Sequence, residues 1–175
     1  MAVKSLKNAT LQLRDGSGTA KVVTLKLGTG NVTWTENYGY EYETERGSIG
    51  SGTVRDADEQ PVDLSVTTKW ENITYDGNDP LADAGDDAVT PAEALKGVGA
   101  ASGWLTSGAD DCEPYACEVY IEFDVTCVAT GVLPEKVTFT EFRCESVAFD
   151  VSAGTLVFSG KSKEVRPNVV REAIT

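Results

Sequence analysis

The chain has 175 residues and carries 15 Lys and Arg against 28 Asp and Glu, a formal net charge of −13 at pH 7. One domain of this length can bury a substantial core, and its acidity disfavours sequence-specific binding to the phosphates of a DNA duplex. The sequence has no histidine, which excludes Ser–His and Cys–His nucleophile pairs and removes the commonest metal ligand.

Neither a membrane span nor a secretory signal is predicted. No stretch approaches 18 consecutive apolar residues, and the first residues lack the apolar run of a signal peptide. We therefore expect a soluble, acidic single domain that is made inside the cell.

Strands are predicted for most of the first 70 residues, because apolar and polar residues alternate there with a period of two. Residues 10–15, 20–27 and 31–35 are separated by glycine turns. In residues 38–45 three tyrosines alternate with three glutamates, so that each type occupies one face. Residues 46–60 are rich in glycine and charge without a period, and we expect a projecting loop.

The middle of the chain combines one clear strand with an acidic insert, residues 72–111. Residues 62–70 alternate strictly and predict a strand that is apolar on one face. Within the insert, Thr90-Pro91-Ala92-Glu93 is typical of a helix start with a capping box, and Gly97 ends the helix early.

The last third is again predicted to be β, with strands near residues 118–128, 135–147 and 155–163. Val119, Ile121, Phe123, Val125 and Cys127 face the core in this prediction, with Tyr120 on the opposite face. Residues 164–175 are expected to be an extended tail. The fold class is therefore all-β: one domain, residues 1–175, with a β-sandwich, one short flanking α-helix and long loops.

The four cysteines, Cys112, Cys117, Cys127 and Cys144, do not have the two close pairs of a structural zinc site. Free, partly buried thiols are the favoured interpretation. A disulfide within residues 112–144 and a zinc site are the alternatives.

Candidate chemical sites are weak. The acidic residues 76–87 fit only the first positions of a calcium loop, and a solvated acidic loop is the better interpretation. Residues 47–52 lack the lysine of a phosphate-binding loop. Facing carboxylates on strands could suggest a glycosidase pair, but many like-charged neighbours are more typical of a solvated surface. We expect no catalytic residues, no metal and no cofactor.

Carboxylates instead gather on strand faces that do not face the core. Like charges opposed in a sheet destabilise it by up to about 1 kcal/mol per pair. We therefore expect the negative charge of these strand faces to serve a function. One use is a surface past which a polyanion moves without a binding minimum. Solubility alone is the simpler explanation.

Several segments, taken in order, resemble the tail tube (major tail) proteins of tailed bacteriophages. They span roughly residues 10–160 and are Gly30-Asn-Val-Thr-Trp34-Thr-Glu36, Tyr42-Glu-Thr-Glu-Arg46-Gly47, Asp56-Ala-Asp-Glu-Gln-Pro61-Val-Asp-Leu-Ser65, Trp70-Glu71, Cys112-Glu-Pro-Tyr115-Ala, Phe142-Arg143-Cys144-Glu145-Ser146 and Ser152-Ala-Gly154-Thr155-Leu-Val-Phe-Ser-Gly160. Residues 72–111 and 161–175 take no part in the resemblance.

The resemblance implies a structural, non-enzymatic virion protein, made in the host cytoplasm. Hexameric rings of such a protein stack into the tail tube, and four strands of each subunit join a continuous β-barrel around a channel. Genomic DNA passes through that channel without specific binding. Sheath or terminator proteins and tail-tip or baseplate proteins are the implied partners, and no membrane insertion is implied.

Carried over to this chain, the resemblance assigns three groups of residues. Candidates for the channel lining are Glu41, Glu43, Glu45, Asp63, Glu122 and Asp124. The loop that would reach a neighbouring subunit or ring includes Arg46, Gly47, Ile49, Val54, Arg55, Asp56, Asp58 and Glu59. Basic residues of the tail, expected to meet an acidic patch of a neighbour, are Lys161, Lys163, Arg166 and Arg171.

Two other functions stay open from the sequence alone. The chain could be a carbohydrate- or protein-binding β-sandwich of a virion or cell surface that uses Trp34, Trp70 or Trp104 as a platform. It could also be a hydrolase that uses two acidic residues.

Overall fold

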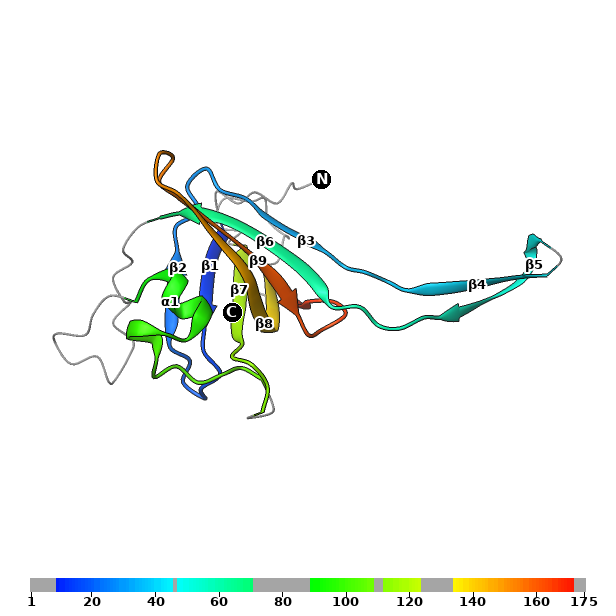
Figure 1. Ribbon diagram of the computed structural model, residues 1–175, viewed down its shortest axis with the longest axis horizontal. Helices are drawn as coiled ribbons and strands as arrows, with labels where there is room; N and C mark the ends of the chain where they lie inside the picture. The colour runs from blue at the N-terminus through cyan, green and yellow to red at the C-terminus, as the bar shows by residue number, and fades with distance from the viewer. Residues whose placement is uncertain (1–8, 46, 71–88, 109–111, 124–133, 172–175) are drawn as a thin grey trace.

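The computed structural model describes residues 9–45, 47–70, 89–108, 112–123 and 134–171. The fold is all-β with one short α-helix, and it consists of a layered body from which one long arm extends (Figure 1). The strands are β1 (Ala9–Arg14), β2 (Val22–Leu25), β3 (Val32–Thr35), β4 (Tyr40–Glu45), β5 (Ser48–Asp56), β6 (Val62–Lys69), β7 (Cys117–Phe123), β8 (Glu135–Asp150), β9 (Thr155–Ser162) and β10 (Asn168–Arg171).

The body is one eight-stranded sheet in the order β2–β1–β7–β8–β9–β6–β3, and β10 adds to β8. All of these pairs are antiparallel. The strands β4 and β5 form a separate two-stranded sheet. The expected all-β sandwich with one short flanking helix is confirmed.

The two layers of the sandwich share the 16-residue strand β8. Its first half pairs with β7 up to Phe142, and from Phe142 onward it pairs with β9. Register shifts interrupt both pairings, and Glu141, inside the shift against β7, has a positive φ of 47°. Such bulges bend a strand and increase its twist, so the sheet folds over itself at this point.

The core fills the space between the layers. Leu13 and Ile121 of one layer and Leu64 and Phe158 of the other are at most 2% exposed. The ring of Trp34 on β3 meets the ring of Phe139 on β8 edge-on, with the ring centroids 5.7 Å apart. This contact joins an edge of one layer to the centre of the other.

Helix α1 (Pro91–Lys96) begins as the sequence predicts. Thr90 Oγ1 accepts a hydrogen bond from the Glu93 N–H, and Glu93 Oε2 accepts one from the Thr90 N–H at 2.9 Å. Gly97 ends the helix with φ 62°, a conformation that glycine adopts without a Cβ penalty. The buried Leu95 and Ala94 pack the helix against β1, β2 and β8.

The described part of the insert 72–111 belongs to the core. Val89 and Trp104 are 6% and 7% exposed, and the 3-10 turn η2 (Gly99–Ala101) buries Ala101 completely. The acidic residues 76–87 lie outside the described residues. No helix in the described ranges is long and apolar enough to cross a membrane.

Two predictions of irregular structure were wrong. Residues 48–56, expected within a loop, form strand β5 and pair with β4. Glycine hides the period there: a Cβ on Gly52 would stand 1.9 Å from the Glu43 carbonyl oxygen, so only glycine allows this close approach. Residues 168–171, expected in an extended tail, form strand β10 on β8.

Tyr120 was predicted to face solvent and is 7% exposed. The guanidinium carbon of Arg14 lies 3.5 Å from the centre of the Tyr120 ring and covers it. The neighbouring predictions for Val119 and Ile121 are confirmed, since both are fully buried. Val125 and Cys127 lie outside the described residues.

We expect Phe139→Ala to lower the free energy of unfolding by about 3–5 kcal/mol, because it empties a fully buried site and removes the partner of Trp34. Urea denaturation followed by tryptophan fluorescence measures this. Leu105→Ala is the control, since Leu105 is 59% exposed, and its effect should stay within about 0.5 kcal/mol. Equal effects of the two substitutions would contradict the described core.

Candidate assembly surfaces

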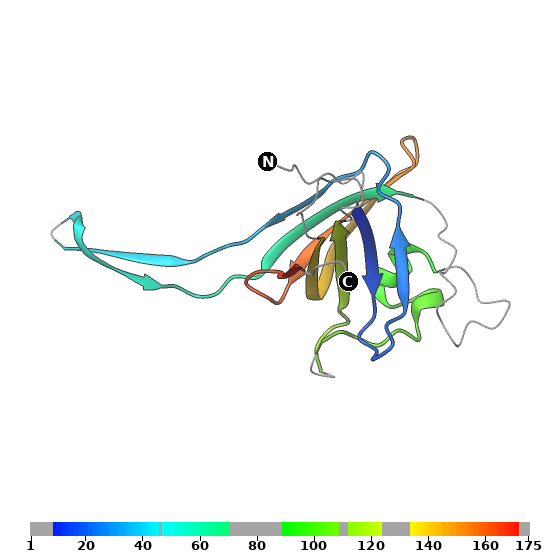
Figure 2. The ribbon, with the colours of Figure 1, turned by 180° about the vertical axis from the view of Figure 1, so that it is seen from behind.

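The arm, residues 36–60, is a two-stranded ribbon that leaves the body between β3 and β6 (Figures 1 and 2). Its strands β4 and β5 pair with each other, and in the part of the chain that the structure describes no third strand joins them. An isolated two-stranded hairpin is at best marginally stable in water. The arm is therefore expected to become more stable when another surface covers it.

The two faces of the arm differ in chemistry. Tyr42 is opposite Val54, and Tyr40 precedes Tyr42 on the same face; these three side chains are 62%, 58% and 52% exposed. On the other face Glu43 Oε2 accepts a hydrogen bond from Arg55 Nη2 at 2.8 Å. We call Tyr40, Tyr42 and Val54 the tyrosine strip. An apolar strip with this much exposed surface is typical of an interaction surface.

The base of the arm is closed by polar contacts, one of which, from Asn37 to Asp63, reaches the body. The Ala57 N–H donates to the Gly39 carbonyl at 3.0 Å and closes the ribbon. Asn37 Nδ2 donates to Asp63 Oδ2 at 2.9 Å. The Tyr38 hydroxyl donates to Glu36, which raises the pKa of Tyr38. The arm thus has a defined exit direction.

Sheet edges are a second candidate surface. Among the described strands, β3 pairs with β6 alone, and residues 143–150 of β8 pair with β9 alone. At each side of the layer β3–β6–β9–β8, the outermost strand therefore has one unpaired edge. Unpaired N–H and C=O groups at an edge are ready to pair with another chain.

The outer face of that layer is rich in short hydroxyl side chains. Ser65, Ser159 and Ser146 lie opposite one another across three strands, and the hydroxyls of Ser146 and Ser159 are 2.8 Å apart. Thr33 and Thr67 flank this row. Charged positions such as Asp63, Lys161 and Lys69 lie toward the strand ends.

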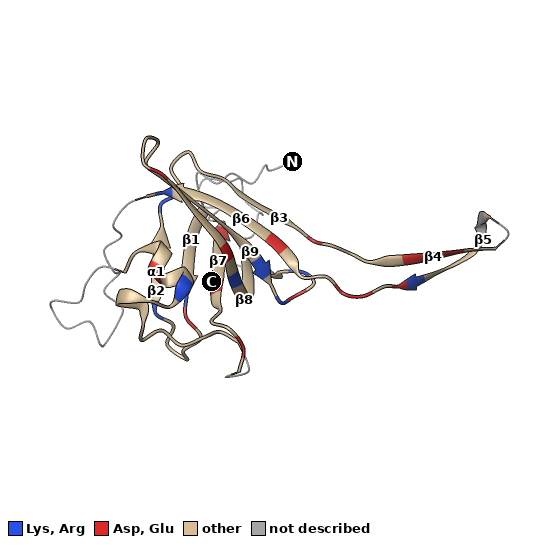
Figure 3. Ribbon diagram, in the orientation of Figure 1, with Lys and Arg blue, Asp and Glu red and all other residues tan. Residues whose placement is uncertain are grey.

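The expected channel-lining carboxylates are not brought together in one subunit (Figure 3). Glu41, Glu43 and Glu45 belong to β4 in the arm. Asp63 lies on β6 in one layer, and Glu122 lies on β7 in the other. Asp124 is outside the described residues.

Among the expected contact residues, Val54, Arg55 and Asp56 lie on β5, and Gly47 and Ile49 lie at its start. Asp58 and Glu59 follow in the returning segment and are exposed. Arg46 lies outside the described residues. The structure therefore places most of this group on the arm, together with β4, which the sequence prediction had not assigned to it.

Two of the four basic residues expected to contact a neighbour, Lys163 and Arg171, have carboxylate partners within their own chain. Lys163 Nζ contacts Glu113 Oε1 at 2.7 Å and Glu141 Oε2 at 3.4 Å. Arg171 Nε donates to Glu135 Oε2 at 2.8 Å. Lys161 is opposite Asp63 in the sheet. Arg166, in the turn before β10, is exposed.

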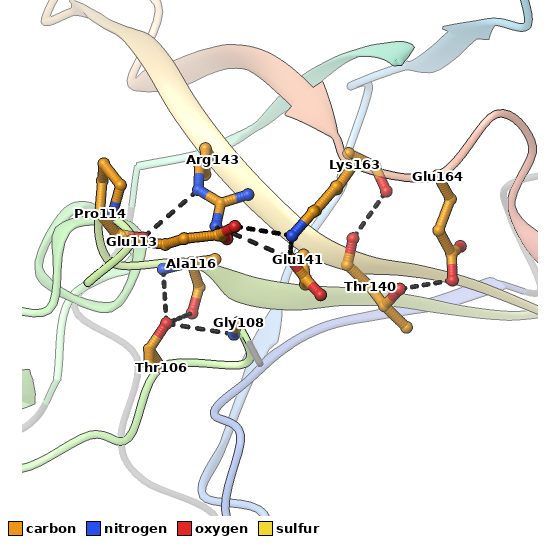
Figure 4. Close-up of polar contacts among 11 residues, drawn as sticks. Thr106, Gly108, Glu113, Pro114, Ala116, Thr140, Glu141, Arg143, Lys163 and Glu164 are labelled. Atoms are coloured by element: carbon orange, nitrogen blue, oxygen red, sulfur yellow. Dashed lines mark hydrogen bonds and ion pairs between the residues drawn. The ribbon is translucent and has the colours of Figure 1, made fainter. Parts of the chain in front are cut away.

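A polar cluster holds the bend of β8 (Figure 4). Arg143 pairs with Glu113, and its Nη2 lies 3.6 Å from Glu141 Oε2. Lys163 bridges Glu113 and Glu141 from the end of β9. The hydrogen bond from Lys163 lowers the pKa of Glu113 and raises that of Lys163 itself. The cluster joins the segment before β7, the bulge of β8 and the turn after β9.

The described cysteines and Trp104 are poorly suited to a reactive or binding site. Cys112, Cys117 and Cys144 are free thiols, and burial raises the pKa of Cys117 to about 12, which suppresses its reactivity. Trp104 is buried and unsuited to a binding platform, whereas Trp34 and Trp70 are 38% and 42% exposed. Within the described ranges, His, Cys, Asp and Glu nowhere gather in a group of three that could hold a metal ion.

The chain matches no family model, and no curated protein matches its sequence. Among solved structures, it resembles the sheath/tube terminator of an extracellular contractile injection system, PVC, seen by cryo-electron microscopy in the extended state. The two share 8% identity with a TM-score of 0.49, and the match covers 99% of each chain. Similarity at this level does not define a family.

We expect acid to weaken the fold partly through Glu113. Its pKa is lowered in the folded state, so its stabilising contribution is present above its ordinary value of 4.5 and is lost as the pH falls through the folded pKa. Glu113→Gln should therefore lose less stability than the wild type between about pH 5 and pH 3. Urea midpoints across this range measure the effect.

Glu145→Gln is the matched control, because it removes an exposed carboxylate of β8 that lies outside the polar cluster. It should follow the wild-type pH dependence. If Glu113→Gln also follows the wild-type curve, the polar cluster does not contribute to acid sensitivity.

Proposed function

We propose that the chain is a non-enzymatic structural protein of a phage virion whose hexameric rings stack into the tail tube and conduct genomic DNA. The observation that carries the proposal is the arm: a ribbon with a strip of exposed tyrosines that has no partner among the described residues. A surface of this kind on an otherwise well-packed body favours assembly with further copies of the chain.

The open edges suggest how a ring closes. In this proposal the open edge of β3 in one subunit pairs with residues 143–150 of β8 in the next, which extends the layer β3–β6–β9–β8 around the ring. Six repeats would remove every free edge of that layer. These four strands are the ones that would form the continuous barrel.

The outer face of the same layer then lines the channel. Short Ser and Thr side chains at its centre keep the wall smooth, and few cations are available there to hold phosphates. Asp63 remains a channel-lining residue in this arrangement, whereas Glu41, Glu43 and Glu45 leave it with the arm. Glu122 faces the outside of the tube.

The partners proposed for the assembled tube are sheath or terminator proteins around it and tail-tip or baseplate proteins at its end. A protein- or carbohydrate-binding module is the second candidate, favoured by the exposed Trp34 and Trp70. Glycan-array binding by a strictly monomeric protein, lost on Trp70→Ala, would support that candidate instead.

Removal of the arm should abolish tube formation and leave the body folded. Because Ala57 N–H and Gly39 C=O already close the ribbon, an Asn-Gly turn can replace residues 40–56. Negative-stain microscopy and light scattering measure assembly, and circular dichroism measures folding. Tubes formed by the armless variant would overturn the role of the arm.

A matched pair of point variants separates the chemistry of the arm from its length. A double variant, Tyr40→Ser with Tyr42→Ser, removes both aromatic rings of the tyrosine strip and should prevent assembly. Thr44→Ser with Thr53→Ser changes exposed residues of the same ribbon and should assemble normally.

The channel face can be tested by thiol labelling in a Cys112→Ser background. The variant Ser65→Cys should react in assembled tubes with a small maleimide. It should resist a maleimide that carries a bulky polymer, because the polymer cannot enter a narrow channel. In unassembled protein both reagents should react. Mass spectrometry of the labelled chain measures this.

Thr10→Cys is the control, since Thr10 is exposed on the other layer and should react with both reagents before and after assembly. If the cysteine at position 65 behaves in the same way within tubes, the layer β3–β6–β9–β8 does not face the channel.

A further inference from the structure

Aromatic side chains mark both open edges of the layer β3–β6–β9–β8. Trp34 on β3 is opposite the buried Leu64, and Phe149 on β8 is opposite the buried Leu156, so both rings lie on the core-facing side of the layer. Yet Trp34 and Phe149 are 38% and 46% exposed. The two rings therefore extend the core face to both edges of the layer, where part of each ring stays uncovered.

The backbone of β3 presents its inward-facing residues to the open edge. The Thr67 N–H donates to the Asn31 carbonyl at 2.8 Å, so the odd-numbered residues of this segment direct their N–H and C=O groups toward β6. Residues along an antiparallel strand alternate in this direction. Val32 and Trp34 therefore direct their backbone groups away from β6, to the edge that another chain can reach.

The same alternation determines which residues of β8 direct their backbone groups outward. One row of directly opposed residues crosses all four strands: Val32, Val66, Phe158 and Val147. Along such a row, hydrogen-bonded and non-hydrogen-bonded pairs alternate. Because Val32 and Val66 are a non-hydrogen-bonded pair, Val147 directs its groups away from β9. Phe149, two residues further along β8, does the same.

Topology determines the direction of the contact between two copies. All three pairings within the layer are antiparallel, so β3 and β8 at its two edges run in opposite directions. Rotation about the axis of a ring keeps the direction of every strand. The strand β3 of one copy therefore runs antiparallel to β8 of the next copy.

Closure of the layer into a barrel also requires a stagger. Strands of a barrel tilt by about 35–45° from its axis, which staggers adjacent strands by about one residue and four strands by about four residues. In the row across one copy Val32 is level with Val147. A stagger of four residues toward the β8–β9 turn places Val32 opposite Val151 and Trp34 opposite Phe149.

A stagger in the other direction is blocked by the fold. Phe142 pairs with Cys117 of β7 on one side and with Ser162 of β9 on the other. The open edge of residues 143–150 therefore continues the edge that β7 occupies up to Phe142. A shift of β3 toward earlier residues of β8 would bring it against β7.

We propose that Trp34 of one copy and Phe149 of a second copy are directly opposed in an antiparallel β3–β8 contact between neighbouring subunits. The inference rests on the proposed function and specifies the direction and register of its edge contact. Both residues direct their N–H and C=O groups to the shared edge, so the pair is hydrogen-bonded. Their rings form an aromatic cross-strand pair, which makes the core face continuous from copy to copy.

Disulfide cross-linking tests this register. Thr35→Cys and Ala148→Cys are combined in a Cys112→Ser background, because residues 35 and 148 are exposed and would be a non-hydrogen-bonded pair with Cα atoms about 4.5 Å apart. Assembled protein is oxidised with oxidised glutathione. Two protein thiols become one disulfide, and the glutathione disulfide is reduced to two thiols. Denaturing, non-reducing electrophoresis should show a ladder of several chain lengths.

The control combines Thr35→Cys with Ser146→Cys, which keeps the same strand and face but shifts the register by two residues. The Cα atoms would then be about 8 Å apart, too far for a disulfide, so no ladder is expected. Tubes that give no Thr35–Ala148 ladder, or an equal one from the control, would overturn the register and leave the proposed function standing. Wild-type protein that stays monomeric at high concentration would overturn both.

A second measurement uses no cysteine. Thr35→Asp with Ala148→Asp places like charges opposite each other at exposed positions, so the concentration needed for assembly should rise about fivefold or more while circular dichroism stays unchanged. Thr35→Lys with Ala148→Asp places opposite charges there and should assemble as the wild type does. Equal assembly concentrations for the two double variants would contradict the inference.

Discussion

The bend of β8 at Glu141 decides the architecture of the body. Phe139 and Phe142 are three residues apart and would point to opposite faces of a regular strand, yet both are fully buried. The bulge inserts the extra residue that turns both inward. A positive φ in a non-glycine residue costs on the order of 1–3 kcal/mol, and the contacts of Glu141 with Arg143 and Lys163 help to hold it there.

Predictions from sequence succeed where the signal is local and fail where it depends on a partner strand. Alternation within a strand and the capping box at Thr90 are local signals, and both are confirmed. The burial of Tyr120 under Arg14 depends on a neighbouring strand, and the sequence carries no sign of it. For β5 and β10 the missing information is likewise the partner strand: Gly47, Gly50 and Gly52 conceal the period of β5, and β10 has four exposed side chains without apolar alternation.

The placement of the candidate site residues depends on the same missing information. The tyrosine–glutamate alternation of β4 was read correctly, but alternation alone does not say whether either face meets a core. In the structure neither face does, because β4 pairs only with β5 in the described chain. From the sequence, the returning half of the arm was therefore predicted to be a contact loop. The glutamates of its outgoing half, β4, were predicted to line the channel.

This relocation changes how a channel of these subunits would let DNA pass. An acidic stripe of six carboxylates would repel phosphates, but the five of these residues that the structure describes do not lie together in one subunit. The face proposed to line the channel instead presents hydroxyls at its centre, with Asp63 opposite Lys161 toward one end and Lys69 toward the other. DNA slides freely where no position along the wall binds it much more strongly than the next, and a neutral, short-chained wall meets that condition without net repulsion.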